Sequence, residues 1–404
     1  MRSRPDVALI SLYPADGVRH GGRSGVASYA ANLAQGLSKA GAGVHVLAPR
    51  AEGARPRWRD GDVCVERAFA RGPGAGPAAA AAALRTGAPV VHLQFELFLY
   101  GGASALPGLL AALSLGRRSL SRRSRPSTVV TAHQVVDPAS VDAGFVELHG
   151  IRVPAVLART GLAAVQRAIG ALPDAAIVHE PLFAEHLPGA VVIPHGVEHV
   201  ERADRADSRA RLGLAADRLV VLCFGFVAPY KGLELACEAA ELAAGEVQLV
   251  VAGGEHPRHP DTSYVSRLRS RYGRHVRFTG FVPEGELAAW FAAADVVLLP
   301  YPRPHASSGA LALALAHGTP VLLSPALARA VDAPAALAAP DDAEGLAERL
   351  RLLAAEPSTL ELLRWASGHL AEGRSWPEVA RRHLDLYREV IDARGAPAGF
   401  ASAV

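Results

Sequence analysis

The sequence predicts an α/β protein made of two doubly wound, Rossmann-like domains. Short apolar runs rich in β-branched residues alternate with helical patterns along the chain, which is typical of parallel sheets built from βαβ units. At 404 residues the chain is longer than a single core usually holds, so two domains are expected. The apolar runs also form two series, separated by a charged stretch at residues 201–211.

The first series predicts the strands of an N-terminal domain, residues 1–198. The predicted strands are residues 7–12, 44–47, 90–93, 129–132, 176–178 and 191–193. After the first strand, Val26, Tyr29, Leu33 and Leu37 recur at helical spacing, and this helix should end near Gly41. Residues 72–83 are rich in Gly, Pro and Ala and should form a loop that enters an Ala-rich helix.

The second series predicts a C-terminal domain, residues 199–374, followed by a closing helix and tail at 375–404. The predicted strands are residues 219–224, 247–252, 276–279, 296–299 and 321–324. Two consecutive doubly wound domains should enclose an interdomain cleft at the carboxyl edges of their sheets, where such folds bind ligands.

Composition narrows the class of protein. A net charge of +3 with 50% hydrophobic residues describes a globular chain, not a polycation that would bind nucleic acid. The three cysteines have neither disulfide nor metal-ligand spacing, and Cys223 and Cys237 should be core residues. We expect no bound metal. No signal peptide or membrane-spanning run is found, so a cytoplasmic location is expected.

Five arginines lie between Arg117 and Arg125. A solvated helix face is the favoured interpretation, because charge runs usually have that role. The alternative is contact with an anionic membrane surface, which would make the protein peripheral at the inner membrane face.

A glycine-rich loop follows the first predicted strand and contains Gly21, Gly22 and Gly25. Glycine lets a ligand approach the backbone closely, although a flexible turn is the alternative. The pattern Gly-x-Gly-x-x-Gly cannot be fitted here, which weakens an oxidoreductase interpretation.

Polar residues stand at the ends of two other predicted strands of this domain. His133 ends the fourth strand and can donate a hydrogen bond to a sugar hydroxyl or position an acceptor; a packed histidine is the alternative. His92 has the same two interpretations, and the packed one is favoured. Glu96 and Asp137 lie just beyond strand ends and are weaker candidates for the acceptor side.

The second domain carries a candidate phosphate site. Ser307, Ser308, Gly309 and Ala310 feed a helix N-terminus, where free backbone N–H groups and the helix dipole suit a diphosphate. The alternative is that Ser308 merely caps a core helix. Lys231, one of only two lysines, would present an ammonium near that diphosphate, although a surface lysine is the ordinary case.

Loops after three strands of this domain are candidate nucleotide contacts. Gly225 and Gly253 follow the first and second strands. Phe281 and Val282 follow the third, and their backbone groups could hold the nucleotide base.

Taken in order, these segments resemble the family 4 glycosyltransferases, which have the GT-B fold of two facing Rossmann-like domains. The resemblance covers nearly the whole chain and depends on order and spacing rather than on one motif. The similar segments are the Gly21-Gly22 loop and residues 131–133, 192–198, 224–232, 252–254, 278–283, 294–300 and 316–321. Residues 375–387 resemble the closing helix that returns to the first domain in that family.

The resemblance implies transfer of a sugar from a UDP- or GDP-type nucleotide sugar, with retention at the anomeric carbon and without a cofactor or required metal. The donor would bind the second domain through Lys231. The acceptor, which could be a small molecule, a glycan or a lipid-linked molecule, would bind the first domain beside His133. These two residues are the candidate catalytic residues.

The sequence departs from the family pattern in two places. Phe226 follows Gly225 where the family usually has an arginine, and Arg303 or Arg23 could supply the missing charge. The family's two glutamates, separated by seven residues, fall at His305 and Leu313. Arg303 and His305 are therefore uncertain contacts to the donor sugar, and the chain resembles a branch that lacks the glutamate pair.

Two other functions compete with the transferase hypothesis. A non-catalytic sugar-nucleotide binder or partner subunit would also explain the missing glutamates. A nucleotide-sugar epimerase can share the fold, but the charged cleft pattern of that group is not found in this sequence.

Overall fold

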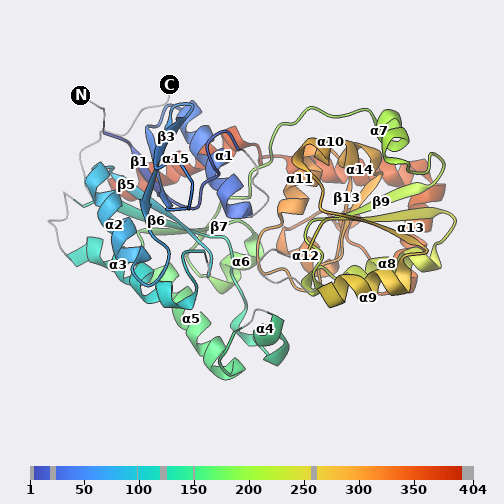
Figure 1. The fold of residues 1–404 in the computed structure, drawn as a ribbon, viewed down its shortest axis with the longest axis horizontal. Coiled ribbons are helices and arrows are strands. Elements are labelled where there is room, and N and C mark those ends of the chain that lie inside the picture. Colours follow the sequence, from blue (N-terminus) through green and yellow to red (C-terminus); the bar gives the residue numbers. More distant parts are fainter. Residues whose placement is uncertain are drawn as a thin grey trace. The chain divides into compact units, whose positions relative to one another are not determined.

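The computed structural model describes residues 4–18, 24–97, 99–118, 125–148, 151–255 and 262–393. The described chain forms two compact units (Figure 1). Unit 1 comprises the described residues up to Gly196, His305–Ser307 and those from Trp376 onward. Unit 2 comprises Val197–Pro304 and Ser308–Ser375.

Among the described residues, unit 1 is built on an eight-stranded sheet in the order β3-β4-β2-β1-β5-β6-β7-β8. The pairs are parallel except β3 with β4, which is antiparallel. The order reverses between β1 and β5, as in doubly wound folds. The strands are β1 Val7–Ile10, β2 Val44–Pro49, β3 Arg57–Asp60, β4 Val63–Phe69, β5 Val90–Phe95, β6 Ser127–Ala132, β7 Ala175–Val178 and β8 Val191–Val192.

Helices cover both faces of this sheet. They are α1 Gly25–Lys39, α2 Ala75–Thr86, α3 Leu106–Arg118, α4 Ala143–Leu148, α5 Ala155–Ala171, α6 Pro181–His186 and α15 Trp376–Asp392. Val7 and Leu9 of β1 pack in one apolar cluster with α1 and α15, which lie side by side (Figure 1). Ala8 and Ile10 pack on the other face with α2 and α3. Because successive side chains alternate between faces, both faces require apolar residues.

Among the described residues, unit 2 is built on a parallel five-stranded sheet in the order β11-β10-β9-β12-β13. The strands are β9 Leu219–Phe224, β10 Val247–Ala252, β11 Val276–Gly280, β12 Val296–Leu299 and β13 Val321–Leu323. The helices are α7 Arg205–Leu212, α8 Leu233–Leu242, α9 Thr262–Tyr272, α10 Leu287–Ala293, α11 Gly309–His317, α12 Pro325–Ala330, α13 Ala343–Ala355 and α14 Pro357–Ala371. The order reverses between β9 and β12, which is the topological switch point of this unit.

The predicted fold class is confirmed, and each predicted strand is present with small shifts of its bounds. The hairpin of β3 and β4 was not predicted. Arg57 and Arg59 of β3 are exposed and only Trp58 is buried, so this edge strand has no apolar run to mark it. The charged stretch at 201–211 is also more than a linker, because its second half forms α7.

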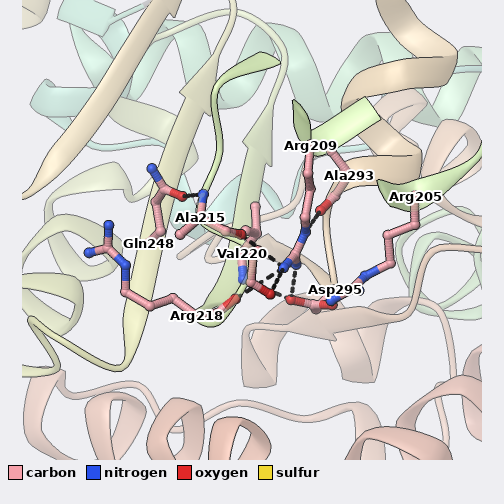
Figure 2. Close-up of polar contacts among 9 residues, drawn as sticks. Arg205, Arg209, Ala215, Arg218, Val220, Gln248, Ala293 and Asp295 are labelled. Atoms are coloured by element: carbon pink, nitrogen blue, oxygen red, sulfur yellow. Dashed lines mark hydrogen bonds and ion pairs between the residues drawn. The ribbon is translucent and has the colours of Figure 1, made fainter. Parts of the chain in front are cut away.

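One buried carboxylate fastens α7 to the amino-terminal edge of the unit 2 sheet (Figure 2). Asp295 stands directly before β12 and is 4% exposed. It is hydrogen-bonded to buried Arg209 of α7, and it accepts a hydrogen bond of 2.8 Å from the backbone N–H of Val220 in β9. Arg205, which is more exposed, donates to the other carboxylate oxygen at 2.7 Å.

The guanidinium of Arg209 is also surrounded by carbonyl groups (Figure 2). It donates to Ala293 O at 2.9 Å and to Ala215 O at 3.0 Å. A buried charge needs this many partners because it has lost its water. The network thus holds α7, β9 and β12 together at the edge of the sheet opposite the carboxyl ends of the strands.

In the part of the chain that the structure describes, no helix is both long and apolar enough to cross a bilayer.

Candidate functional site

The loops that follow β9 and β12 leave the sheet of unit 2 at its topological switch point. Open α/β sheets bind ligands at this place, outside the carboxyl ends of the strands. The loop after β9 carries Lys231, at the end of the short 3₁₀ helix Pro229–Lys231. The loop after β12 carries Tyr301 and leads to Ser308, the N-cap of α11.

The ammonium of Lys231 lies near two aromatic rings. Its Nζ lies 5.5 Å from the ring centroid of Tyr230 and 4.2 Å from that of Tyr301. It also donates a hydrogen bond to the hydroxyl of Tyr301. Burial lowers the pKa of Lys231, while Tyr230 and Cys223 act in the opposite direction.

Lys231 forms no ion pair with any residue that the structure describes. The aromatic faces stabilise the cation, but they do not neutralise it. A partly buried, uncompensated positive charge attracts an anion more strongly than an exposed one, because water screens it less.

Ser308 begins α11 as a true N-cap. Its Oγ accepts a hydrogen bond of 3.2 Å from Leu311 N, which fulfils the capping alternative. A capping role for Ser308 is compatible with anion binding at the N-terminus of α11. Gly309 and Ala310 are the first two helical residues, and their N–H groups have no intrahelical acceptor. Ser307 belongs to unit 1, and its buried Oγ has no hydrogen-bond partner.

Glycines let the site loops pass close to one another. A Cβ at Gly232, where φ is 63°, would lie 2.1 Å from Pro300 O. A Cβ at Gly253 would lie 1.9 Å from Gly225 O, and Gly225 itself has a φ of 108°. Close backbone packing therefore explains Gly253 without a ligand, and a nucleotide contact there stays a prediction.

The two predicted base contacts after β11 differ in exposure. Phe281 is 69% exposed and lies beside Gly254. Val282 is buried in the core of unit 2, so only its backbone is suited to a ligand. Leu313, where the family pattern has a glutamate, packs against the same core from α11.

In unit 1, His133 lies in a buried polar network at the carboxyl ends of β5, β6 and β7. Its Nε2 is hydrogen-bonded to Gln94 Oε1 at 2.8 Å and its Nδ1 to His179 Nε2 at 3.2 Å. Burial, reinforced by the neighbouring histidines, holds its pKa well below the ordinary value. Both ring nitrogens are thus occupied and the ring is neutral, so the packed alternative describes its geometry better than direct donation to a sugar.

His92 is buried as predicted. It is hydrogen-bonded to Tyr387 Oη at 2.6 Å and to Thr131 Oγ1 at 2.8 Å. Burial also keeps its pKa well below the ordinary value.

The aromatic cluster around His133 could not be predicted from the sequence. The ring of Tyr29 in α1 lies 4.7 Å from His133, 4.8 Å from His179 and 5.2 Å from Trp376 of α15. These residues are far apart in the chain, so no local motif could join them. The structure also explains Gly196, because a Cβ there would lie 2.5 Å from the Trp376 ring.

The other residues predicted to contact the acceptor lie in different local settings, and a contact with an acceptor stays a prediction for each. Gly21, Gly22 and Arg23 lie outside the described residues. Gly25 begins α1 with open space around it, and Glu96 follows β5. The Asp137 carboxylate accepts a hydrogen bond of 2.8 Å from Ala139 N and caps a short 3₁₀ helix, which is a structural role.

The remaining residues of interest lie in the β12–α11 loop and the arginine run. Arg303 is exposed. His305 belongs to unit 1, with its ring 5.6 Å from that of Phe145. Arg117 lies near the end of α3, Arg125 is described, and residues 119–124 of the run lie outside the described chain.

Within the described residues, no group of three or more His, Cys, Asp or Glu is arranged to hold a metal ion.

Comparison with known proteins finds a matching family model and several curated relatives. Residues 218–356 match the model of Glycosyl transferases group 1. D-inositol 3-phosphate glycosyltransferase 1 of Catenulispora acidiphila is 33% identical over 48% of this chain and 50% of its own length. The chain thus spans about half the length of the first curated relatives it matches. A D-inositol 3-phosphate glycosyltransferase of Xylanimonas cellulosilytica is 27% identical over 97% of this chain and 98% of its own.

Solved structures show the same fold over the whole chain. Sucrose-phosphate synthase of Thermosynechococcus elongatus has a TM-score of 0.75 at 21% identity, over 96% of this chain and 100% of that one. HepE of Anabaena, in complex with UDP and glucose, has a TM-score of 0.67 at 15% identity, over 95% and 100%. The chain therefore has the two-domain GT-B fold.

Proposed function

We propose that this protein is a retaining glycosyltransferase that moves a sugar from a nucleotide-diphosphate sugar to an acceptor. The observation that carries the proposal is the uncompensated ammonium of Lys231, which shares the hydroxyl of Tyr301 with the N-cap of α11. The match to the model of Glycosyl transferases group 1 includes all of these residues, which supports the proposal.

The proposed role of the site is to stabilise the negative charge of the leaving diphosphate. When the sugar leaves the donor, negative charge develops on the diphosphate and must be stabilised. Lys231 supplies a full positive charge at fixed position. The free N–H groups of Gly309 and Ala310 supply hydrogen bonds and the positive end of the helix dipole. This arrangement acts on the leaving group, while unit 1 is proposed to bind the acceptor.

The nucleotide is proposed to be UDP, with GDP as the second choice. The complex of HepE with UDP and glucose supports UDP, and the exposed ring of Phe281 offers a surface for a base. The names of the curated relatives make D-inositol 3-phosphate the first acceptor to test. Retention and independence of metal are proposed on the family resemblance, and transfer in excess EDTA tests the latter.

A second candidate is a sugar-nucleotide binder without catalytic activity. It is favoured by Leu313, a partly buried residue packed against the core, which leaves that position of α11 without a carboxylate. Such a protein would bind the donor through the same Lys231 and α11 contacts but would not turn it over.

Calorimetric titration with UDP, GDP and their sugars, followed by transfer and hydrolysis assays, distinguishes these functions. Lys231→Met should weaken UDP binding by about tenfold or more, since hydrogen bonds to charged groups contribute about 1.5–3 kcal/mol. The matched control is Lys39→Met, which removes the only other lysine, exposed at the end of α1. Binding without turnover favours the second candidate, and equal binding by both variants contradicts the assignment of Lys231.

A further inference from the structure

Tyr301 joins the two halves of the candidate phosphate site. It follows β12 and is 6% exposed. Its hydroxyl accepts a hydrogen bond from Lys231 Nζ and another, of 3.4 Å, from Ser308 Oγ. Its own backbone is fixed, because its carbonyl accepts a hydrogen bond from Ser324 Oγ.

Lysine needs such a partner if its charge is to act from a fixed place. Its side chain is a flexible four-carbon stem, and ordering it when a ligand binds would cost affinity. The Tyr301 hydroxyl gives Nζ a defined acceptor, and the same hydroxyl is tied to the N-cap of α11. The ammonium is thereby held on the side of the helix N-terminus before any ligand arrives.

A phenol suits this role better than a carboxylate. A carboxylate at the same place would form an ion pair and neutralise the ammonium. Burial raises the pKa of Tyr301 far above neutrality, so the hydroxyl stays uncharged. The lysine is therefore oriented without losing its charge.

We propose that Tyr301 is a positioning residue for the diphosphate of the donor, acting through Lys231, whose ammonium it holds on the side of the α11 N-terminus. This inference rests on the proposed function, because it assumes that Lys231 meets a diphosphate. It predicts that the Tyr301 hydroxyl matters for ligands with two phosphates more than for ligands with one.

Tyr301→Phe tests the proposal, because it removes the hydroxyl and keeps the ring beneath the ammonium. The matched control is Tyr264→Phe in the same unit, where a buried hydroxyl donates to Glu234 Oε2 at 2.7 Å. Each variant loses one hydrogen bond to a charged group, and Tyr301→Phe also loses the longer bond from Ser308, so both should lower thermal stability. Only Tyr301→Phe should weaken UDP binding, by about tenfold, and lower the preference for UDP over UMP.

A double-mutant cycle separates positioning from a general structural role. In a Lys231→Met background, Tyr301→Phe should cause no further loss of UDP affinity, because the group it positions is gone. The inference is overturned if Tyr301→Phe binds UDP like wild type, or if the two losses simply add. If wild type binds no diphosphate nucleotide, the proposed function itself fails, and the inference fails with it.

Discussion

Replacing Asp295 with asparagine should loosen unit 2 and leave unit 1 intact. The carboxylate is buried and bonded to Arg209, to Arg205 and to the N–H of Val220 (Figure 2). Asparagine keeps the shape of the side chain but removes its charge. The guanidinium of Arg209 would then be a buried charge without a counter-ion.

The expected loss of stability depends on the hydrogen bonds that Arg209 keeps in the variant. Breaking a buried ion pair by removing one partner costs about 3–5 kcal/mol. Arg209 keeps the carbonyl groups of Ala293 and Ala215 at 2.9 and 3.0 Å, which solvate part of its charge. We therefore expect a loss at the lower end of that range, about 3 kcal/mol. This corresponds to an increase of about a hundredfold in the equilibrium constant for local opening of unit 2. Arg205→Ala should cost less than about 1 kcal/mol, because Arg205 is half exposed.

Hydrogen exchange of backbone amides is the suitable assay, because it reports each unit separately. Amides of β9 and α7 should exchange about a hundredfold faster in Asp295→Asn than in wild type. Amides of β1 and β5 in unit 1 serve as the internal control and should not change. Equal protection of β9 in wild type and variant, or an equal effect of Arg205→Ala, would refute this account of the network.

Three further predictions concern the site loops and pH. Gly232→Ala should lower the melting temperature and weaken UDP binding, because the Cβ of the new alanine would overlap Pro300 O. The control, Gly25→Ala, should change neither quantity, because a Cβ at Gly25 would lie in open space. UDP affinity measured by calorimetry should fall as pH rises through the lowered pKa of Lys231, because the ammonium then loses its proton, and Lys231→Arg should remove this dependence. Burial lowers the pKa of His383 to about 4, below its value in the unfolded chain, so the unfolded state binds more protons between these pH values. His383 by itself should therefore lower the stability of unit 1 by about 2 kcal/mol between pH 7 and pH 5, and hydrogen exchange should show a smaller loss in His383→Leu.

The sequence predicts what depends on neighbours in the chain. Strands such as β9 and β12 are continuous apolar runs because both of their faces are buried. Ser308 was recognisable as a cap because small residues precede an Ala- and Leu-rich helix. Lys231 was recognisable because it follows a strand and is one of two lysines in an arginine-rich chain.

The sequence could not predict contacts between distant residues. The hydrogen bond from Lys231 to Tyr301 spans 70 positions, and Tyr301 by itself resembles any aromatic residue after a strand. His133 looked available at a strand end, but Gln94 of β5 and His179, which follows β7, occupy its nitrogens. Arg209 was placed in a charged junction because its burial depends on Asp295, which lies 86 positions away.

The central claim is that Lys231 and the N-terminus of α11 bind the diphosphate of a nucleotide sugar. A crystal structure of the protein with UDP tests it most directly. The account predicts diphosphate oxygens within hydrogen-bonding distance of Lys231 Nζ and of the N–H groups of Gly309 and Ala310. A diphosphate bound elsewhere, with Lys231 still bonded only to Tyr301, would contradict it.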